Sequence, residues 1–91
     1  MARFVALLEF TGDEALRLQT RPAHREYLQS LLAAGQLWMS GPWADDTGAM
    51  LIYEADSLAD AEALLAVDPY RAAGVLADAR IKEWRVVFQA E

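Results

Sequence analysis

The sequence of 91 residues predicts an α+β fold in which four strands and two helices alternate in the order β-α-β-β-α-β. Three observations lead to this prediction. Apolar residues recur at every second position near both ends of the chain, two internal segments repeat them at helical spacing, and breaks rich in glycine, proline and aspartate separate these segments. This order is typical of a ferredoxin-like domain, a four-stranded antiparallel sheet with two helices on one face.

Composition limits the protein to one small domain. A chain of 91 residues that is 55% apolar excludes disorder, and it supports a single core that association would stabilise. The formal charge is −6, from 14 acidic and 8 basic residues, so we expect no nucleic acid partner and no membrane surface partner. The absence of cysteine excludes disulfides and thiolate chemistry.

Targeting and cofactor signals are lacking. No apolar run approaches the roughly 18 residues of a membrane span, and the start of the chain reads as a strand instead of a signal peptide. We therefore expect a cytoplasmic protein. A single histidine argues against a histidine-based metal cluster, although a mixed site using carboxylates stays open. With no phosphate-binding loop or nucleophile motif either, we expect no cofactor and no metal.

The first strand is predicted over residues 3–10, where Phe4, Ala6, Leu8 and Phe10 share one face. A short helical turn over 14–18 follows, and the main helix is predicted over 22–34. Pro22 suits a first helical position because it has no N–H to leave unpaired, and Gly35 suits the stop. The apolar stripe of this helix consists of Tyr27, Leu28, Leu31 and Leu32.

The second half of the chain is predicted to contain a β-hairpin, then a helix and a last strand. Strands are predicted over 37–43 and 49–55, joined by a loop at 44–48. Ser57 and Asp60 resemble a capping box that opens a second helix, which must close before Pro69. The last strand is predicted over residues 79–88.

Two helices can cover only one side of a four-stranded sheet. The opposite side is expected to be at least partly apolar, which invites a second copy of the chain. We therefore expect a homodimer in which sheet faces sheet. The residues expected on this open face are Val5, Leu7, Trp38, Leu51, Tyr53 and Trp84.

Several short motifs together resemble the YciI-like (YCII-related) family. They are Arg21-Pro22-Ala23-His24, Gly35 before the second strand, Ser40-Gly41-Pro42, and Asp68-Pro69-Tyr70 followed by Ala73-Gly74. The resemblance covers most of the chain, so residues 1–91 are read as a single YCII-related domain. It implies a ferredoxin-like domain that dimerises into an α+β barrel, as in muconolactone isomerase. It also implies a pocket lined by a histidine and an aspartate, here His24 and Asp68; one related enzyme type is the dehydrochlorinase acting on chlorinated hydroxyhydroquinones.

One departure from the family lies after Pro42. Many relatives carry a longer loop there, whereas residues 43–48 make the whole connection in this chain. If that loop covers the pocket, the pocket here is either more open or covered by Trp43.

His24 is the candidate general base or acid. An unperturbed imidazole titrates at a pH of about 6.5, which suits proton transfer near neutrality. His24 precedes Leu28 by four positions and Leu31 by seven, so it belongs to the buried stripe of the main helix. The alternative is a histidine that bonds only to backbone or faces water.

Asp68 is the candidate partner that orients His24, as the acid of a catalytic triad does. This role follows only from the resemblance. The residues by themselves favour an Asp-Pro turn whose carboxylate accepts hydrogen bonds from nearby backbone N–H groups.

Six residues are candidates for binding a substrate. A planar guanidinium at Arg21 suits a carboxylate or phenolate, although a surface ion pair is the commoner role for arginine. The other five either line the pocket or occupy ordinary turn and core positions. They are Ser40, Gly41, Pro42, Trp43 and Tyr70.

Two functions remain open from the sequence. In the first, a small cytoplasmic enzyme uses His24 and Asp68 for cofactor-free acid–base chemistry, such as isomerisation, elimination or dehydrochlorination of a small organic acid or aromatic-derived substrate. In the second, the dimer is a non-catalytic module that binds a small metabolite or serves as an accessory subunit.

Overall fold

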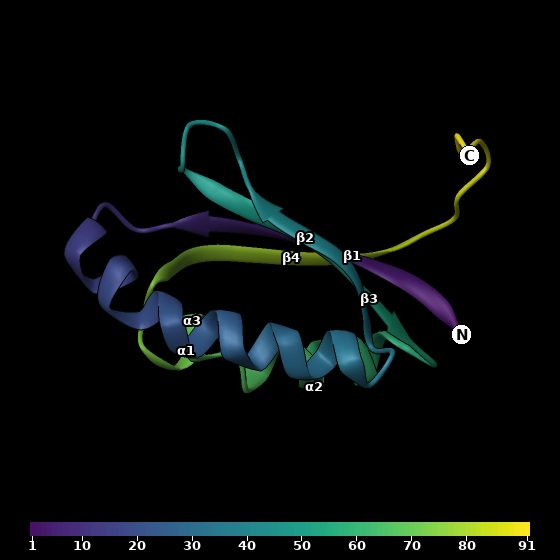
Figure 1. Cartoon of the computed structure of the whole chain (residues 1–91), viewed down its shortest axis with the longest axis horizontal. Helices are drawn as coiled ribbons and strands as arrows, with labels where there is room; N and C mark the ends of the chain where they lie inside the picture. Colours follow the sequence, from purple (N-terminus) through teal and green to yellow (C-terminus); the bar gives the residue numbers. More distant parts are fainter.

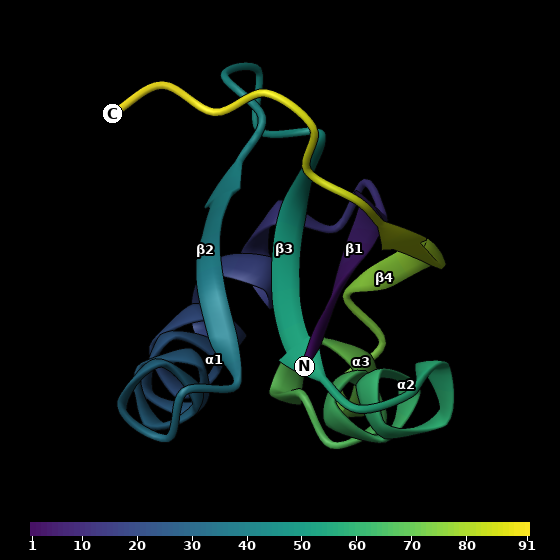
Figure 2. The same cartoon turned by 90° about the vertical axis from the view of Figure 1, so that its right-hand side faces the viewer.

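The computed structural model describes residues 1–91 and contains four strands and three helices in a βαββααβ order. The strands are β1 (Ala2–Phe10), β2 (Leu37–Pro42), β3 (Gly48–Ala55) and β4 (Leu76–Trp84), and the helices are α1 (Glu14–Ala33), α2 (Leu58–Ala66) and α3 (Pro69–Ala72). The strands form one antiparallel sheet in the order β2-β3-β1-β4. All three helices lie on the same side of it (Figures 1 and 2). The predicted ferredoxin-like fold is confirmed, with α3 as one further helical turn.

The core lies between the sheet and the helices. Its members come from alternate positions of β1 and β3, from the start of β2 and from the inner faces of α1 and α2: Phe4, Ala6, Leu8, Leu28, Leu31, Leu37, Ala49, Leu51, Tyr53, Ala55, Ala61 and Leu65. The placement of Leu51 and Tyr53 on the open face was wrong. They pair with Ala6 and Phe4 across the antiparallel ladder, and directly opposed residues share a face.

Helix α1 is longer than the sequence pattern indicated. It begins at Glu14, where the Asp13 side chain accepts a hydrogen bond from the Leu16 N–H at 3.0 Å. The predicted start at residue 22 is wrong, because Pro22 lies inside the helix, on its exposed side. A proline there removes one hydrogen bond of the helix. Figure 1 shows the first turns of α1 set at an angle to the rest of the helix.

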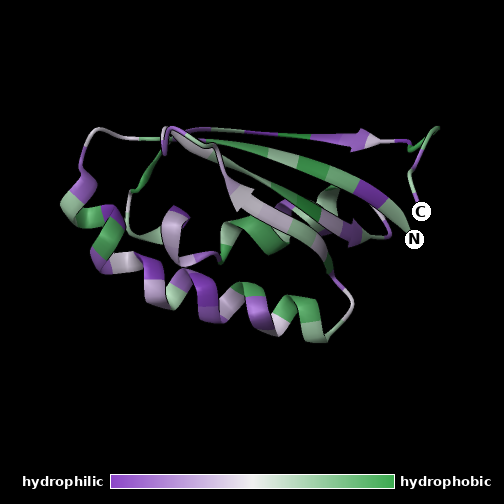
Figure 3. Cartoon of the chain, turned by 45° about the horizontal axis from the view of Figure 1, so that its top comes forward, coloured by the Kyte–Doolittle hydropathy of each residue, from purple (hydrophilic) through white to green (hydrophobic).

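Helix α1 ends where it was predicted to end. Gly35 adopts a positive φ of 76°, and the Gln36 N–H bonds to the Leu31 carbonyl at 2.9 Å in a Schellman arrangement. Hydrophilic and hydrophobic residues alternate along α1 in Figure 3, as expected for a helix that covers a sheet on one side.

The last strand begins at Leu76, earlier than predicted, and ends at Trp84 instead of Phe88. Pairing with β1 controls its length: Trp84 is opposite Arg3, close to the first residue of β1, so β1 offers no partner to residues 86–88. Val87 and Phe88 are therefore exposed in the C-terminal segment. None of the helices is both long and apolar enough to cross a membrane.

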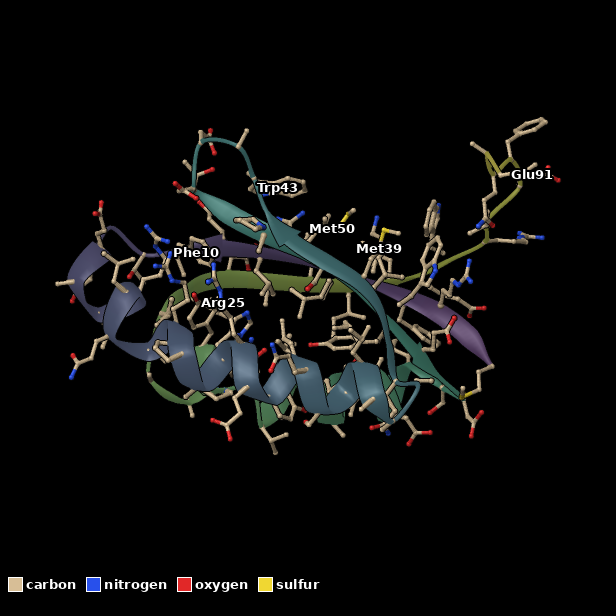
Figure 4. The ribbon with its side chains drawn as sticks, in the orientation of Figure 1. Phe10, Arg25, Met39, Trp43, Met50 and Glu91 are labelled. Carbon is tan, nitrogen blue, oxygen red and sulfur yellow. The ribbon has the colours of Figure 1, made fainter.

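The opposite side of the sheet has no helix over it. Leu7 and Trp84 lie on this side with more than 40% of their surface exposed, and Met39 and Met50 point away from the helices in Figure 4. Trp38 lies beside Trp84 with 6.3 Å between the rings, and the Arg3 guanidinium stacks on the Trp38 ring at 3.7 Å. The uncovered face is thus apolar at its centre.

Candidate active site

The structure brings His24 and Asp68 together, although 44 positions separate them in the sequence. Nδ1 of His24 lies 2.7 Å from Oδ1 of Asp68, and both side chains are buried beneath the sheet. A carboxylate at Nδ1 favours the tautomer that carries the proton there. The other ring nitrogen, Nε2, is then available as a base.

Asp68 is held in place by its own turn. It is the N-cap of α3, and Oδ1 accepts a hydrogen bond from the Tyr70 N–H at 2.8 Å. Pro69 follows at the first helical position, where its fixed φ suits a helix start. The same carboxylate oxygen therefore takes part both in the Asp-Pro turn and in the contact with His24.

Tyr70 packs directly on the imidazole. The rings of His24 and Tyr70 are parallel within 4°, with centroids 3.7 Å apart, and Phe10 meets Tyr70 edge-on at 5.6 Å. Burial raises the pKa of the Tyr70 hydroxyl, and nearby arginines partly offset that rise. Tyr70 therefore fixes the plane of the His24 ring.

His24 borders a cavity of about 240 Å³ between α1 and β2. Five of the six predicted substrate-binding residues line it: Arg21, Ser40, Gly41, Pro42 and Tyr70. Ser40 faces the cavity because it pairs with Leu51, a residue on the core side of β3. Asp68 does not line the cavity but lies behind His24, fully buried.

Trp43 does not line this cavity. Its indole packs against Gly48 across the hairpin, where a Cβ would come within 2.9 Å of Nε1. Trp43 lines a neighbouring hollow of about 720 Å³ instead, which shares Phe10, Arg17 and Asp46 with the first. That hollow is the larger of the two, but it contains neither His24 nor Asp68.

The short hairpin loop contributes Asp46 to the cavity and leaves Trp43 outside it. Asp45 accepts hydrogen bonds from the side chain and the backbone of Thr47, which lower the pKa of its carboxyl group. The left-handed φ of 59° at Asp46 then turns the chain back toward Gly48. Residues 43–48 therefore border the cavity at one edge, without an indole over it.

Two buried polar atoms have no hydrogen-bond partner, the Tyr53 hydroxyl and Oδ2 of Asp68. Burial, followed by the negative charge of Asp68, raises the pKa of Tyr53 far above that of an ordinary tyrosine. Nε2 of His24 is not one of these buried, unpaired atoms, and it forms no hydrogen bond within the chain. The free nitrogen of the imidazole therefore remains accessible from the cavity.

Sequence reasoning missed two arginines that line the cavity, Arg17 and Arg25. The spacing of these arginines could have identified them, because Arg17 precedes Arg21 by four positions and Arg25 follows it by four. A helix predicted to start at Pro22 excludes Arg17 from that pattern. No group of three or more His, Cys, Asp or Glu side chains is arranged to hold a metal ion.

Known proteins resemble this chain in sequence. Protein YciI of Escherichia coli O6:H1 is 39% identical over 82 residues, covering 79% of this chain and 84% of that protein. The uncharacterized protein YjpA of Bacillus subtilis is 41% identical over 63 residues, covering 69% of this chain and 73% of that protein.

Solved structures resemble it in fold. The 5-chloro-2-hydroxyhydroquinone dehydrochlorinase TftG of Burkholderia phenoliruptrix, in complex with 2,5-dihydroxybenzoquinone, superposes with a TM-score of 0.79 at 27% identity, covering 91% of this chain and 93% of that one. An antibiotic biosynthesis monooxygenase shares the fold alone, with a TM-score of 0.63 at 14% identity, covering 96% and 99%. The sequence model of the YCII-related domain matches residues 2–85, nearly the whole chain. The chain therefore belongs to the YCII-related (YciI-like) family.

Proposed function

We propose that this protein is a small enzyme in which His24 and Asp68 carry out cofactor-free acid–base chemistry on a small organic acid or aromatic-derived substrate. The observation that carries the proposal is the 2.7 Å contact between His24 Nδ1 and Asp68 Oδ1, with Nε2 left free beside a cavity. Residues 1–91 would act as one YCII-related domain. The cytoplasmic location expected from the sequence belongs to the same proposal, and fractionation of producing cells tests it.

In this mechanism Nε2 removes a proton from the substrate. Asp68 balances the charge of the imidazolium that results, and the electron-rich face of Tyr70 stabilises the same cation. Arg21, at the cavity wall, stabilises the oxyanion that develops on the substrate. In an elimination, the electrons of the broken bond to hydrogen expel a leaving group such as chloride, and the imidazolium later gives its proton to water.

The first test uses the substrate for which TftG is named. Purified protein is incubated with 5-chloro-2-hydroxyhydroquinone, and released chloride is measured. We expect His24→Ala to lower the rate by at least about 100-fold, the contribution typical of a general base. Asp68→Asn should lower it less, since the base itself remains. Ser30→Ala, on the exposed side of α1, is the control and should match the parent.

One observation favours the alternative, a non-catalytic module. The contact of Asp68 with the Tyr70 N–H gives that carboxylate a structural role at the start of α3. A parent protein that binds 2,5-dihydroxybenzoquinone yet releases no chloride supports this alternative. Equal turnover by the parent, His24→Ala and Asp68→Asn contradicts the enzymatic proposal.

We also propose that two copies pair through the uncovered sheet face to form a dimeric α+β barrel. The central strands present the apolar pairs Val5–Ile52 and Leu7–Met50 to this face. Met39 and Trp84, on the edge strands, are each more than 40% exposed, and charged residues of both signs, such as the paired Arg3 and Glu54, share the face. An apolar centre with a polar rim is the usual anatomy of a protein interface. Mixed charges also allow a self-complementary contact about a two-fold axis.

Light scattering after size exclusion tests the dimer. The expected mass is twice the 10.1 kDa of the chain. Leu7→Lys, at the centre of the open face, should give a monomer. Leu32→Lys is the matched control because Leu32 is 55% exposed on α1, and it should leave the dimer intact. A monomeric parent contradicts this proposal.

A further inference from the structure

Three arginines form a row along the cavity that His24 faces. Arg17, Arg21 and Arg25 recur at every fourth position of α1, and all three line the cavity. Side chains four positions apart are neighbours on a helix surface, so the row extends over about 12 Å along the axis. Figure 4 shows Arg25 between α1 and the sheet, on the same side as Phe10.

No carboxylate of the chain forms an ion pair with this row. The ion pairs of the structure join Arg3 to Glu54, Arg80 to Asp78 and His24 to Asp68, and none of them uses the three arginines. Of the residues that line the cavity only Asp46 is acidic. Three of the chain's eight basic residues therefore gather at one cavity, although the protein as a whole carries a charge of −6.

The guanidinium of Arg17 is held at the far end of the row. It lies 5.2 Å from the centre of the Phe10 ring, in cation–π contact, and Arg17 is half-buried. Arg21 and Arg25 flank His24 in the sequence, three positions before it and one after it. Arg17 therefore lies at the end of the row that contacts Phe10, and Arg21 and Arg25 lie in the part of α1 that carries His24.

We propose that the cavity binds a small dianion whose two negatively charged oxygen groups are separated, one held by Arg21 and Arg25 beside His24 and the other by Arg17. Carboxylate, phenolate and enolate groups all fit this description. The inference deepens the proposed function, since it rests on the same cavity and states the charge of its substrate.

The size and lining of the cavity limit the rest of the molecule. A volume of about 240 Å³ lies below the roughly 300–1,000 Å³ of pockets for drug-sized ligands, so one ring or a short chain fills it. Leu28, Ala49 and Leu51 add apolar side chains to the lining. A flat apolar body with an anionic group at each end matches this arrangement.

A single phosphate group matches it less well. Phosphate sites commonly use the free N–H groups of a helix N-terminus. At the start of α1 the Asp13 side chain already accepts a hydrogen bond from the Leu16 N–H, and the arginines project from the following turns. Guanidinium groups that are spread along a helix favour two separated anionic groups over one compact anion.

Binding measurements with three matched probes test the inference. The probes are isophthalate, with two separated carboxylates on one ring; benzoate, with one; and phenyl phosphate, with both charges on one group. Dissociation constants are measured by calorimetry on the full chain at low salt. We expect isophthalate to bind at least about tenfold more tightly than the other two, as one additional charge-assisted contact provides.

Variants then assign the second anion to Arg17. Arg17→Gln should remove the preference for isophthalate over benzoate while changing benzoate binding less than about twofold. Arg17→Lys, which keeps the charge, should restore part of it. Arg85→Gln, outside the cavity and exposed, is the control and should bind like the parent. Circular dichroism confirms that each variant folds.

Three results overturn the inference: equal binding of isophthalate and benzoate, tighter binding of phenyl phosphate, or equal effects of Arg17→Gln and Arg85→Gln. The proposed function fails separately. If the dianion preference survives in His24→Ala and that variant also turns over substrate as the parent does, the binding inference stands and the catalytic proposal falls.

Discussion

The rings of His24 and Tyr70 lie face to face, 3.7 Å apart and parallel within 4°, while Asp68 bonds to both residues through one oxygen. The imidazole is therefore fixed in two ways. Its hydrogen bond to Asp68 sets the direction of Nδ1, and the Tyr70 ring sets its plane. Asp68 determines the position of Tyr70 as well, because its carboxylate begins the turn that carries the tyrosine.

Replacing the ring of Tyr70 should destabilise the protein more than removing its hydroxyl. Tyr70→Phe keeps the stacked ring, so its free energy of unfolding should stay within about 1 kcal/mol of the parent. Tyr70→Leu loses the stacking with His24 and the edge contact with Phe10, and it should cost about 1–3 kcal/mol more. Urea denaturation measures both; equal losses would show that ring stacking contributes nothing.

Asp68→Ala should destabilise the fold more than Asp68→Asn. Alanine leaves the Tyr70 N–H and the His24 Nδ1–H without their acceptor, at a cost of about 1–3 kcal/mol each. Asparagine keeps a carbonyl oxygen for both donors and the same shape. Chemical denaturation at neutral pH distinguishes the two variants. If alanine is as stable as asparagine, the carboxylate oxygen is not the structural link between His24 and α3.

Gly48→Ala should destabilise the hairpin between β2 and β3. An added Cβ would overlap the carbonyl oxygen of Leu8, which belongs to the paired backbone of β1, and would press on the Trp43 indole. Backbone cannot yield as a side chain can, so we expect a loss of about 2–3 kcal/mol. Gly12→Ala is the matched control, since nothing lies within 4 Å of its Cβ position. Thermal unfolding of the two variants side by side gives the comparison, and equal melting temperatures would contradict the predicted overlap.

Alkaline pH should destabilise the protein through Tyr53. Burial and the charge of Asp68 raise the pKa of this hydroxyl in the folded state above its ordinary value of 10.0. Above that pH the unfolded chain loses a proton that the folded chain retains, so the free energy of unfolding falls as pH rises, by about 1.4 kcal/mol per pH unit for one such group. The contribution of Tyr53 to the free energy of unfolding is complete below pH 10 and is lost progressively as the pH rises above it.

Tyr53→Phe removes this dependence and removes a buried hydroxyl that has no partner. Its stability at neutral pH should therefore equal or exceed that of the parent. Between pH 9 and 11 its stability should fall less steeply; a weaker slope remains because burial also raises the pKa values of Tyr27 and Tyr70. Parallel curves for the parent and Tyr53→Phe would contradict the prediction.

The order of elements was predictable because period-two and helical patterns are separated by strong breaks, as at Gly35 and around Pro69. The ends of elements were less predictable. Pro22 is a typical first helical residue, yet α1 passes through it because Asp13 caps the preceding segment and Arg17 of that segment contacts the Phe10 ring. Trp84 ends β4 because β1 has no further partner to offer, which is a property of the sheet and not of the local sequence.

Within the candidate site, the burial of a residue and its spatial partner were predicted from different observations. The helical position of His24 predicted that it is buried, whereas its neighbour Asp68 followed only from family resemblance, since no local pattern relates residues that lie 44 positions apart. The position of Trp43 could not be predicted, because its indole packs against Gly48 on the other side of the hairpin. Arg17 and Arg25 were missed because their spacing matters only once the helix is known to begin at Glu14.

The halves of the imidazole–carboxylate pair belong to different βα units, one on each side of the hairpin at residues 43–48. Closing a loop of this length has an entropic cost that local contacts do not repay, so such long-range pairs form only with the tertiary structure. Neither half of the polypeptide can hold the site alone. During refolding, recovery of ligand binding should therefore coincide with the completed sheet and never precede it.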